Sequence, residues 1–382
     1  MPLLSGSRFG AADDGNMRPP ARLPQINGLR GLAIIGVLSF HILAGMFTAQ
    51  GISPLLSVPL TNGWSGVNLF FILSGFVLFL PYAGDDGAVA RLANPLGFYR
   101  RRCRRLLPLF YTATLITWAL AVVRGAPADP GQLLSVLSFG FILDAHSFGP
   151  SFNMPLWSLG DEIAFSVLFP VLTLVVGRHG IWRIFAVTAV VALAMRIIGI
   201  WRFPALQSAT FNSDMFLCRV DEFVLGMALA HLYAMGWSPR RPVLWAAVGA
   251  ALVLLAWTGF DLVLREEWPP PCRAGLNDLL DAGLAAIVIG ALAPGTGLAA
   301  LLAWRPLQLI GVMCYSIYIW HMPLLQLIAP DRAAMPGPVF AFRIAAFLVV
   351  TFATAALSYR FIEFPRTGDW RRLFLLRRAN AA

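Results

Sequence analysis

The chain has 382 residues, of which 58% are hydrophobic and only 13% are charged. Its mean hydropathy is +0.72. Apolar runs of about twenty residues recur along most of its length, and each could cross the ~30 Å hydrocarbon core of a bilayer. This composition excludes an ordinary soluble domain, and the runs do not alternate as the strands of a membrane barrel would. We therefore expect an all-α integral membrane protein.

The net charge of +10 comes from 29 basic residues, all of them arginine, against 19 acidic residues. The arginines cluster near the ends of the apolar runs, so they indicate membrane topology rather than a nucleic-acid surface, and no nucleic-acid partner is expected. A chain without lysine cannot use Schiff-base chemistry or a lysine nucleophile. The four cysteines show no metal-ligand or redox spacing, so neither a metal site nor a disulfide framework is expected.

Residues 1–25 lack the apolar core of a signal peptide and are expected to form a flexible cytoplasmic tail. A single membrane domain follows over residues 26–365, and the basic residues 366–382 are expected to form a second cytoplasmic tail. Ten spans are expected, near residues 28–47, 64–82, 106–123, 157–177, 182–200, 215–235, 243–264, 279–298, 307–328 and 339–362. Every second link is rich in arginine, which by the positive-inside rule places both termini in the cytoplasm. The apolar segment 133–145 is too short to span and is expected to be a re-entrant or interfacial piece.

The first span begins with Asn27-Gly28-Leu29-Arg30-Gly31 and contains His41. About three helical turns separate the arginine from the histidine, so both lie on one helix face, ~16 Å apart along the axis. This arrangement suits a donor with an anionic head and a long thin arm, such as coenzyme A. In the alternative interpretation, Arg30 anchors the topology and His41 forms a hydrogen bond in a helix interface. Buried ionisable groups in membranes are, however, usually functional.

Two further segments place charged residues at the ends of spans. The arginine-rich run Tyr99–Arg105 opens the third span, where its guanidinium groups either bind the phosphates of a nucleotide or anchor the chain to lipid headgroups. Asp161 and Glu162 open the fourth span, just inside its outer boundary. We favour helix capping for Asp161. For Glu162 we favour orienting an imidazolium or binding an acceptor hydroxyl.

Polar residues also lie inside the sixth and ninth spans. Arg219 and Glu222 are three residues apart, which predicts an internal ion pair. The segment Tyr315–His321 forms a polar and aromatic stripe in the ninth span. Pro323 disturbs the helix there and is expected to expose a backbone carbonyl that satisfies His321.

Six segments, taken in order, resemble the acyltransferase 3 family of polytopic bacterial enzymes, which includes O-antigen and exopolysaccharide O-acetyltransferases. The resemblance covers the chain from Gly28 to Pro365 and shows two departures. Asn27 stands where the family usually has an acid, and Ser166 stands where a tyrosine is common. The matching segments are Asn27–Gly31 with His41, Asn68–Phe76, Arg102–Pro108, Leu156–Phe165, Tyr315–His321 and Ser358–Pro365.

The resemblance implies a multi-pass enzyme of the bacterial inner membrane that moves an acyl group, expected to be acetyl, from acyl-CoA to a hydroxyl of a carbohydrate or lipid-linked glycan. It implies that Arg30 and His41 are essential and that Arg102 and Arg105 bind acyl-CoA. We expect His41 to act as a general base, with a covalent acyl-histidine as the alternative. Glu162 is expected to hold the acceptor or orient the imidazole. A transporter or flippase for a glycan or lipid is the alternative function, because it would share the topology and the intramembrane charges.

Overall fold

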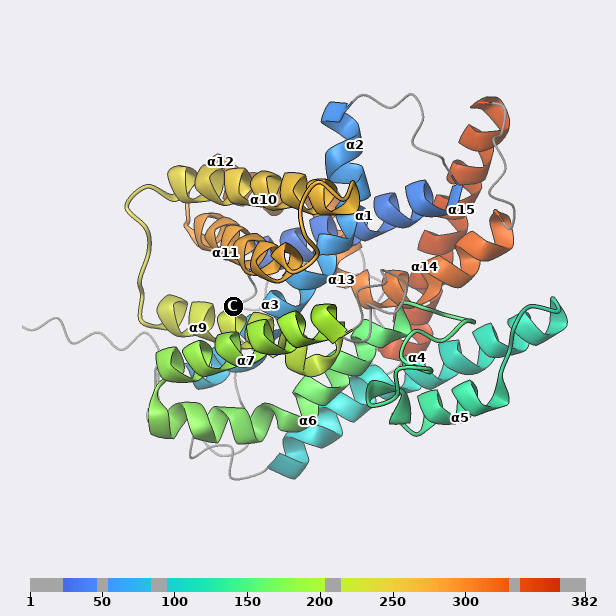
Figure 1. Cartoon of the computed structure of the whole chain (residues 1–382), viewed down its shortest axis with the longest axis horizontal. Coiled ribbons are helices and arrows are strands. Elements are labelled where there is room, and N and C mark those ends of the chain that lie inside the picture. Colours follow the sequence, from blue (N-terminus) through green and yellow to red (C-terminus); the bar gives the residue numbers. More distant parts are fainter. Residues whose placement is uncertain (1–22, 47–53, 84–94, 203–213, 330–336, 365–382) are drawn as a thin grey trace, which may run out of the picture.

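The computed structural model describes residues 23–46, 54–83, 95–202, 214–329 and 337–364, and within these ranges the chain is helical without any strand (Figure 1). Elements of the first half are α1 (Pro24–Met46), α2 (Pro54–Thr61), η1 (Gly63–Ser65), α3 (Gly66–Phe79), η2 (Leu80–Tyr82), α4 (Pro95–Val123), α5 (Pro130–Leu137), η4 (Gly140–Ile142) and α6 (Leu156–His179). Elements of the second half are α7 (Ile181–Arg202), α9 (Phe216–Ala234), α10 (Pro242–Leu264), α11 (Cys272–Leu292), α12 (Gly297–Leu302), α13 (Arg305–Val312), α14 (Cys314–Ile328), α15 (Gly337–Ser358) and the π-helical turn η5 (Tyr359–Glu363).

The expected all-α membrane architecture is confirmed, although fewer helices qualify as spans than the ten predicted. In the described ranges, eight helices are long and apolar enough to cross a membrane, and the pair α13 and α14, bent by 72°, makes a ninth if it counts as one span. The remaining predicted span, the sixth in chain order, is α9, which carries Arg219, Asp221 and Glu222. These three side chains are buried within the bundle rather than facing lipid, which is how a helix with such residues is accommodated.

Two segments differ from the predicted span boundaries. Helix α4 begins at Pro95 rather than near residue 106, so the whole arginine run Tyr99–Arg105 belongs to the helix. The segment 133–145 forms part of α5 and the short turn η4, and both elements are too short to span a bilayer. The predicted C-terminal tail and residues 1–22 of the predicted N-terminal tail, with their arginines, lie outside the described residues, so the cytoplasmic position of the termini stays a prediction. Residues 24 and 25, predicted to be tail, belong to α1.

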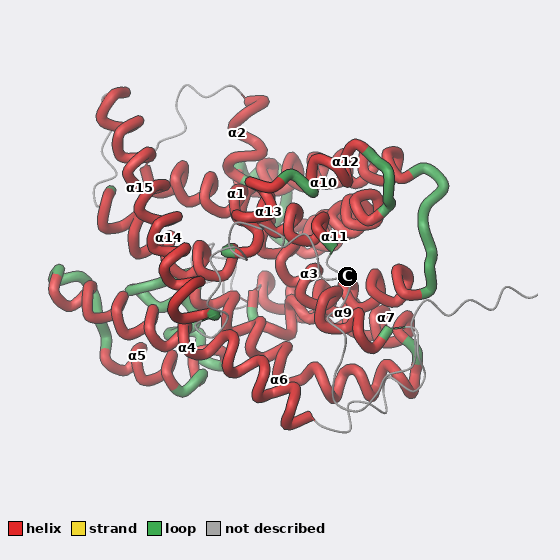
Figure 2. Tube along the Cα trace, turned by 180° about the vertical axis from the view of Figure 1, so that it is seen from behind, coloured by secondary structure: helices red, strands yellow, loops and turns green. Residues whose placement is uncertain are grey.

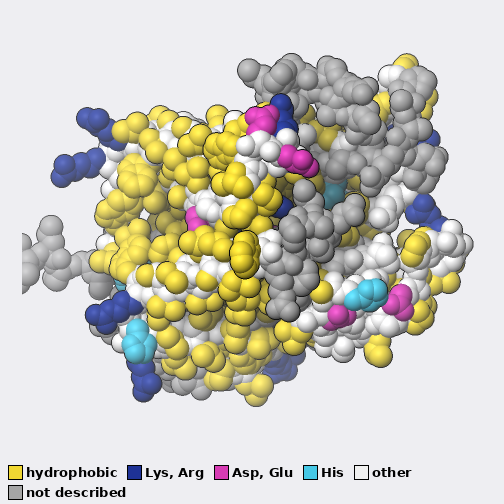
Figure 3. Space-filling model, in the orientation of Figure 1, with side chains coloured by type: hydrophobic (Ala, Val, Ile, Leu, Met, Phe, Trp, Pro, Cys, Tyr) yellow, Lys and Arg dark blue, Asp and Glu magenta, His cyan; other side chains and the backbone are white. Residues whose placement is uncertain are grey.

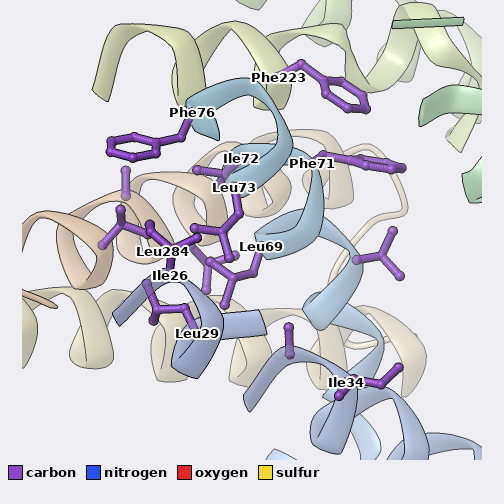
Figure 4. Packing of buried hydrophobic residues seen from close by; sticks show 14 of the residues in the cluster. Ile26, Leu29, Ile34, Leu69, Phe71, Ile72, Leu73, Phe76, Phe223 and Leu284 are labelled. Carbon is purple, nitrogen blue, oxygen red and sulfur yellow. The ribbon is translucent and has the colours of Figure 1, made fainter. Parts of the chain in front are cut away.

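Helix α3 lies near the middle of the bundle, between α1 and α9 (Figures 1 and 4). Figure 4 shows its buried apolar side chains directed towards both neighbours, and the ring of Phe71 stacks on Phe223 of α9 with the centroids 4.5 Å apart. Helices α10 and α11 run side by side, whereas α4, α5, α14 and α15 gather at the other end of the molecule (Figures 1 and 2). The sequence motifs of α1, α3 and α14 thus lie towards the interior of the fold.

The surface is as apolar as a lipid-facing protein requires. Hydrophobic side chains cover much of the face drawn in Figure 3, and arginine side chains appear towards its edges. Large apolar residues are exposed along α7 and α10, for example Val190 and Leu255 with exposed fractions of 68% and 56%. A protein with such an apolar surface would aggregate in water, whereas in a bilayer the lipid tails cover that surface.

Two glycines allow α3 and α9 to pack backbone against backbone. A Cβ atom at Gly75 would lie 1.9 Å from the carbonyl oxygen of Phe223, and one at Gly226 would lie 1.9 Å from that of Ile72. Small residues permit this close approach between membrane helices, where packing rather than the hydrophobic effect drives association. The second-span segment that includes Ser74-Gly75 therefore has a packing role besides any chemical one.

Replacing Gly75 with alanine is expected to lower the unfolding temperature of the detergent-solubilised protein by at least ~3 °C, because the added methyl forces two helix backbones apart. Gly275 is the matched control, since it also lies in a helix but a Cβ there would meet nothing within 4 Å. Gly275→Ala should leave the unfolding temperature unchanged or raise it slightly. Equal melting of both variants would contradict the close packing of α3 on α9.

Candidate active site

His41 lies in the second half of α1, and its imidazole contacts a backbone carbonyl and a second histidine. Its Nδ1 atom is 2.9 Å from the carbonyl oxygen of Val37, one turn earlier, and 3.3 Å from Nε2 of His321 in α14. The ring of Phe40 packs edge-on with the centroids 5.0 Å apart. In the described parts of the chain no hydrogen bond involves Nε2 of His41, so this nitrogen is open to a substrate.

The contacts of His321 determine which nitrogen of each ring carries a proton. His321 is fully buried, and its Nδ1 atom is 2.5 Å from the carbonyl oxygen of Tyr318, so in the neutral ring this nitrogen donates. Its Nε2 atom then has a lone pair, so the proton on Nδ1 of His41 is shared between the carbonyl oxygen of Val37 at 2.9 Å and this nitrogen at 3.3 Å. This arrangement leaves the lone pair of His41 on Nε2, which is the form that a general base needs.

Pro323 does free a backbone carbonyl in α14, but a different residue uses it. Proline at this position removes the hydrogen bond to the carbonyl of Ile319, four residues earlier. The buried amide of Asn153 donates to that oxygen at 3.1 Å. His321 instead donates to the carbonyl of Tyr318. The prediction that the carbonyl freed by Pro323 satisfies His321 was therefore wrong, although His321 does have a backbone partner.

The first-span motif positions α1 against two neighbouring helices. A Cβ atom at Gly28 would lie 2.1 Å from the carbonyl oxygen of Leu302 at the end of α12, and one at Gly31 would lie 2.4 Å from that of Leu307 in α13. Both glycines therefore serve close backbone contact. They fix the beginning of the helix that carries Arg30 and His41.

Arg30 lies ~16 Å before His41 along α1, as the helical geometry of the sequence predicts. In the described ranges its guanidinium makes no hydrogen bond or ion pair, although it interacts electrostatically with Arg105, Glu162 and Glu363. Even a half-buried cation without a direct partner is costly. Arg30 is therefore well placed to bind an anionic ligand.

Glu162 lies with Arg102 in the structure rather than with His41. The Nη2 atom of Arg102 donates to Oε1 of Glu162 and to the hydroxyl of Ser166, the latter at 2.8 Å. The hydroxyl of Ser74 donates to the same glutamate oxygen at 2.7 Å. Since no described hydrogen bond or ion pair joins Glu162 to His41, the geometry favours a role as counterion of Arg102 over a role in orienting the imidazole.

Arg105 is held more loosely than Arg102. Its Nε atom is 3.9 Å from Oε1 of Glu363, and its side chain is 42% exposed. Ser316 donates to the other oxygen of Glu363 at 3.1 Å, which joins the ninth-span segment to the closing segment of the chain. We name Arg30, Arg102 and Arg105 the arginine cluster. Among the described residues they face two carboxylates, Glu162 and Glu363, and so keep a net positive charge.

A second buried polar group lies where α9 and α11 begin. The Nη1 atom of Arg219 donates to Glu222 at 2.6 Å, which confirms the predicted ion pair, and to Asn277 at 3.1 Å. Asn68 of α3 donates to Asp281 at 2.9 Å. We name this set the Arg219 cluster, and its members are Asn68, Asp161, Arg196, Arg219, Asp221, Glu222, Asn277, Asp278 and Asp281.

Three carboxylates of the Arg219 cluster lie close enough to hold a cation. Oxygen atoms of Asp221, Asp278 and Asp281 all fall within 4.8 Å of one another. Arg196 already donates to Asp221, and it donates to Asp278 at 2.6 Å. Its guanidinium therefore supplies the positive charge that an ion would bring, and we assign no metal to this group.

The two histidines, the arginine cluster and the glycine-mediated packing of α1 and α3 all fall on the six segments that resemble one family. The sequence model of that family, acyltransferase 3, describes an acyltransferase domain and matches residues 23–361. The chain belongs to the acyltransferase 3 family. The matched region is an acyltransferase domain of that family.

Curated relatives are similar over most of the chain. It is 29% identical to the putative peptidoglycan O-acetyltransferase YrhL of Bacillus subtilis, with 91% of the chain and 56% of the relative covered. It is 27% identical to the peptidoglycan O-acetyltransferase OatA of Listeria monocytogenes, with 90% and 55% covered. It is 25% identical to the O-acetyltransferase OatA of Staphylococcus aureus, with 91% and 58% covered. The chain thus spans little more than half the length of these relatives, and no solved structure matches it.

Proposed function

We propose that this protein is an O-acetyltransferase of the bacterial inner membrane that moves an acetyl group from acetyl-CoA to a hydroxyl of a cell-envelope carbohydrate. The main support is the arrangement on α1, where a half-buried arginine without a direct partner among the described residues and a histidine with a free Nε2 lie ~16 Å apart. Relatives of the chain are named as peptidoglycan O-acetyltransferases, which is why we propose acetyl as the acyl group and peptidoglycan as the first acceptor to test.

The donor binds, in this proposal, at the arginine cluster. The phosphates of coenzyme A would contact Arg30 and Arg105, whose guanidinium groups are the least engaged of the three. Arginine binds phosphate through charge-assisted, often bidentate hydrogen bonds. Arg102 would hold one side of the donor site in place through Glu162 and Ser166. The thin pantetheine arm would then follow α1 and bring the thioester to His41.

Acetyl transfer at His41 needs one proton acceptor and no further reactant. Nε2 of His41 takes the proton of the acceptor hydroxyl as its oxygen attacks the thioester carbonyl carbon. The new C–O bond forms, the C–S bond breaks, and the proton passes from the imidazolium to the leaving thiolate. The products are an acetyl ester and free coenzyme A. A two-step route through an acetyl-histidine remains the alternative, with His41 as the nucleophile.

Membranes that contain the chain, incubated with radioactive acetyl-CoA, test this function directly. The expected result is alkali-labile radioactivity in the glycan fraction, because acetyl esters hydrolyse in mild base, at a level well above that of membranes from cells with an empty vector. Absence of such label, with the protein present in the membrane and peptidoglycan available, would contradict the proposal.

His321 is expected to position His41 and stabilise its protonated form. Replacing it with glutamine should lower kcat by about 10- to 100-fold, because His41 loses the ring that packs against its imidazole and shares its Nδ1 proton with the carbonyl oxygen of Val37. The KM for acetyl-CoA should stay within about twofold, and the unfolding temperature should be measured alongside. A variant with unchanged kcat, or one whose loss follows the unfolding temperature alone, would show that His321 is only structural.

A further inference from the structure

Pro323 leaves a backbone carbonyl without its helical donor close to the reactive histidines. Proline has no N–H group, so the carbonyl oxygen of Ile319 cannot receive the hydrogen bond that α14 would otherwise provide. Ile319 is 1% exposed, and an unpaired carbonyl that water cannot reach is costly. Ile319 lies two residues before His321, so the turn that carries this histidine depends on a donor from another element.

Asn153, in the loop before α6, supplies that donor. Its Nδ2 atom is 3.1 Å from the carbonyl oxygen of Ile319, and its side chain is fully buried. A carbonyl oxygen only accepts hydrogen bonds, so the amide must present its NH2 group to it. The backbone of Asn153 is itself held, because its N–H donates to the carbonyl of Pro150 at 3.0 Å and its carbonyl accepts from Leu156 at 3.1 Å. The loop therefore presents the donor from a fixed position.

Apolar side chains surround this contact and keep water from replacing it. Phe152, the neighbour of Asn153, packs in one buried cluster with Ile319 and with the adjacent Trp320. Phe141 of η4 belongs to the same cluster, so the segment between α5 and α6 reaches into the bundle as far as α14. Loss of the amide would thus leave the carbonyl of Ile319 buried without a donor.

Asn153 holds the backbone of the turn that carries one member of the imidazole pair. Within this turn the hydroxyl of Tyr318 accepts from Ser158 of α6 at 2.7 Å, and the backbone carbonyl of Tyr318 accepts from Nδ1 of His321. The Nε2 atom of His321 lies 3.3 Å from Nδ1 of His41, which is long for a hydrogen bond, so a small shift of the turn would break the contact. The contact between the two histidines therefore depends on every bond that holds the turn.

We propose that Asn153 is a positioning residue for acetyl transfer. Its bond to Ile319 fixes the turn of α14 that sets His321 against His41. This inference rests on the proposed function and adds to it a residue that lies outside the six segments resembling the family. Without the bond, the carbonyl of Ile319 turns towards another donor and moves the backbone of His321 with it. The imidazole of His41 then loses its fixed orientation, so turnover slows, whereas neither substrate loses a direct contact.

The test measures kcat and both KM values of the full chain, with acetyl-CoA as donor and soluble glycan fragments from peptidoglycan as acceptor. Asn153→Leu removes the amide but keeps nearly the same side-chain size. It should lower kcat per folded protein by about tenfold, because small misplacements of catalytic groups have effects of this order, while both KM values stay within about twofold. Gln132→Leu is the matched control. This buried amide bonds His146 and Ser151 rather than α14, so its loss should leave kcat per folded protein close to that of the wild type.

Replacing Pro323 with alanine shows whether the effect runs through this carbonyl. Alanine restores the N–H group at position 323, so α14 bonds the carbonyl of Ile319 by itself and Asn153 becomes dispensable. In the Pro323→Ala background, Asn153→Leu should therefore change kcat by less than about threefold. If Pro323→Ala alone transfers slowly, the unfolding temperature gives the same comparison. Asn153→Leu should lower it clearly in the wild-type background and little in the Pro323→Ala background.

An equal loss of kcat in both backgrounds, or no loss in either, would overturn the positioning role while leaving the proposed function intact. If Asn153→Leu alone does not accumulate, the double variant decides the question. Its accumulation, with transfer close to that of Pro323→Ala, supports the positioning role, and its failure to accumulate overturns it. Absence of any transfer by the wild type would instead contradict the proposed function itself.

Discussion

Replacing His41 with alanine is expected to lower acetyl transfer by a factor of ~10²–10⁴, the range that a positioned general base contributes. The expectation rests on the free Nε2 atom of His41 and on the contact of its Nδ1 atom with His321, which together favour the basic tautomer. The measurement is the initial rate of ester formation from acetyl-CoA, normalised to the amount of folded protein. The unfolding temperature should change little, because the side chain is only partly buried.

His179 provides the matched control for this experiment. It lies at the exposed end of α6, far in sequence from either histidine of the site. His179→Ala should transfer acetyl at the wild-type rate. If His41→Ala retained more than about one tenth of the wild-type rate, His41 would be neither the general base nor the nucleophile, and another residue would have to activate the acceptor.

Replacing Arg105 with glutamine is expected to raise the KM for acetyl-CoA by about 10- to 100-fold. A charge-assisted hydrogen bond to phosphate contributes ~1.5–3 kcal/mol, and each 1.4 kcal/mol corresponds to a factor of ten. Arg105 suits this test better than Arg102, because its nearest carboxylate is 3.9 Å away and little of the native packing depends on it. Loss of Arg102 would instead leave Glu162 without its counterion and would perturb folding.

Arg104 is the control for the charge change, since it is the adjacent arginine of the same run and is exposed. Arg104→Gln should leave the KM for acetyl-CoA within about twofold of the wild type. A donor KM that responds equally to both substitutions would indicate general attraction of an anion to a basic surface. A donor KM that responds to neither would contradict donor binding at the arginine cluster.

The fold class could be predicted from the sequence because membrane spans depend on local composition. Runs of about twenty apolar residues have few alternatives in lipid, so nearly all predicted spans exist as helices. Helix α9 was also predicted as a span, although it carries three charged residues, Arg219, Asp221 and Glu222. These side chains face the interior of the bundle, which explains how a helix with such residues can lie among membrane spans. The early start of α4 was not visible, since the arginine-rich residues 100–105 near its beginning resemble a loop when hydropathy is the guide.

The site was predictable where one helix determines the geometry and not where several helices meet. The alignment of Arg30 with His41 follows from the helical repeat alone. The contact of His41 with His321 and of Arg102 with Glu162 depends on how α14 and α6 pack against α1 and α4. The only sequence signals for these contacts were polar residues inside apolar runs, which indicate a functional interior without naming the partner.

The most direct test of the account uses the purified protein in liposomes with acetyl-CoA and soluble peptidoglycan fragments. It measures free coenzyme A thiol and acetyl ester in the same sample. The account predicts equal molar amounts of the two products for the wild type and at least ~100-fold less of both for His41→Ala. Ester formation that does not depend on His41 would contradict the account. So would counterflow of unmodified glycan across the liposome membrane in the absence of any acyl donor, since that result would identify a transporter.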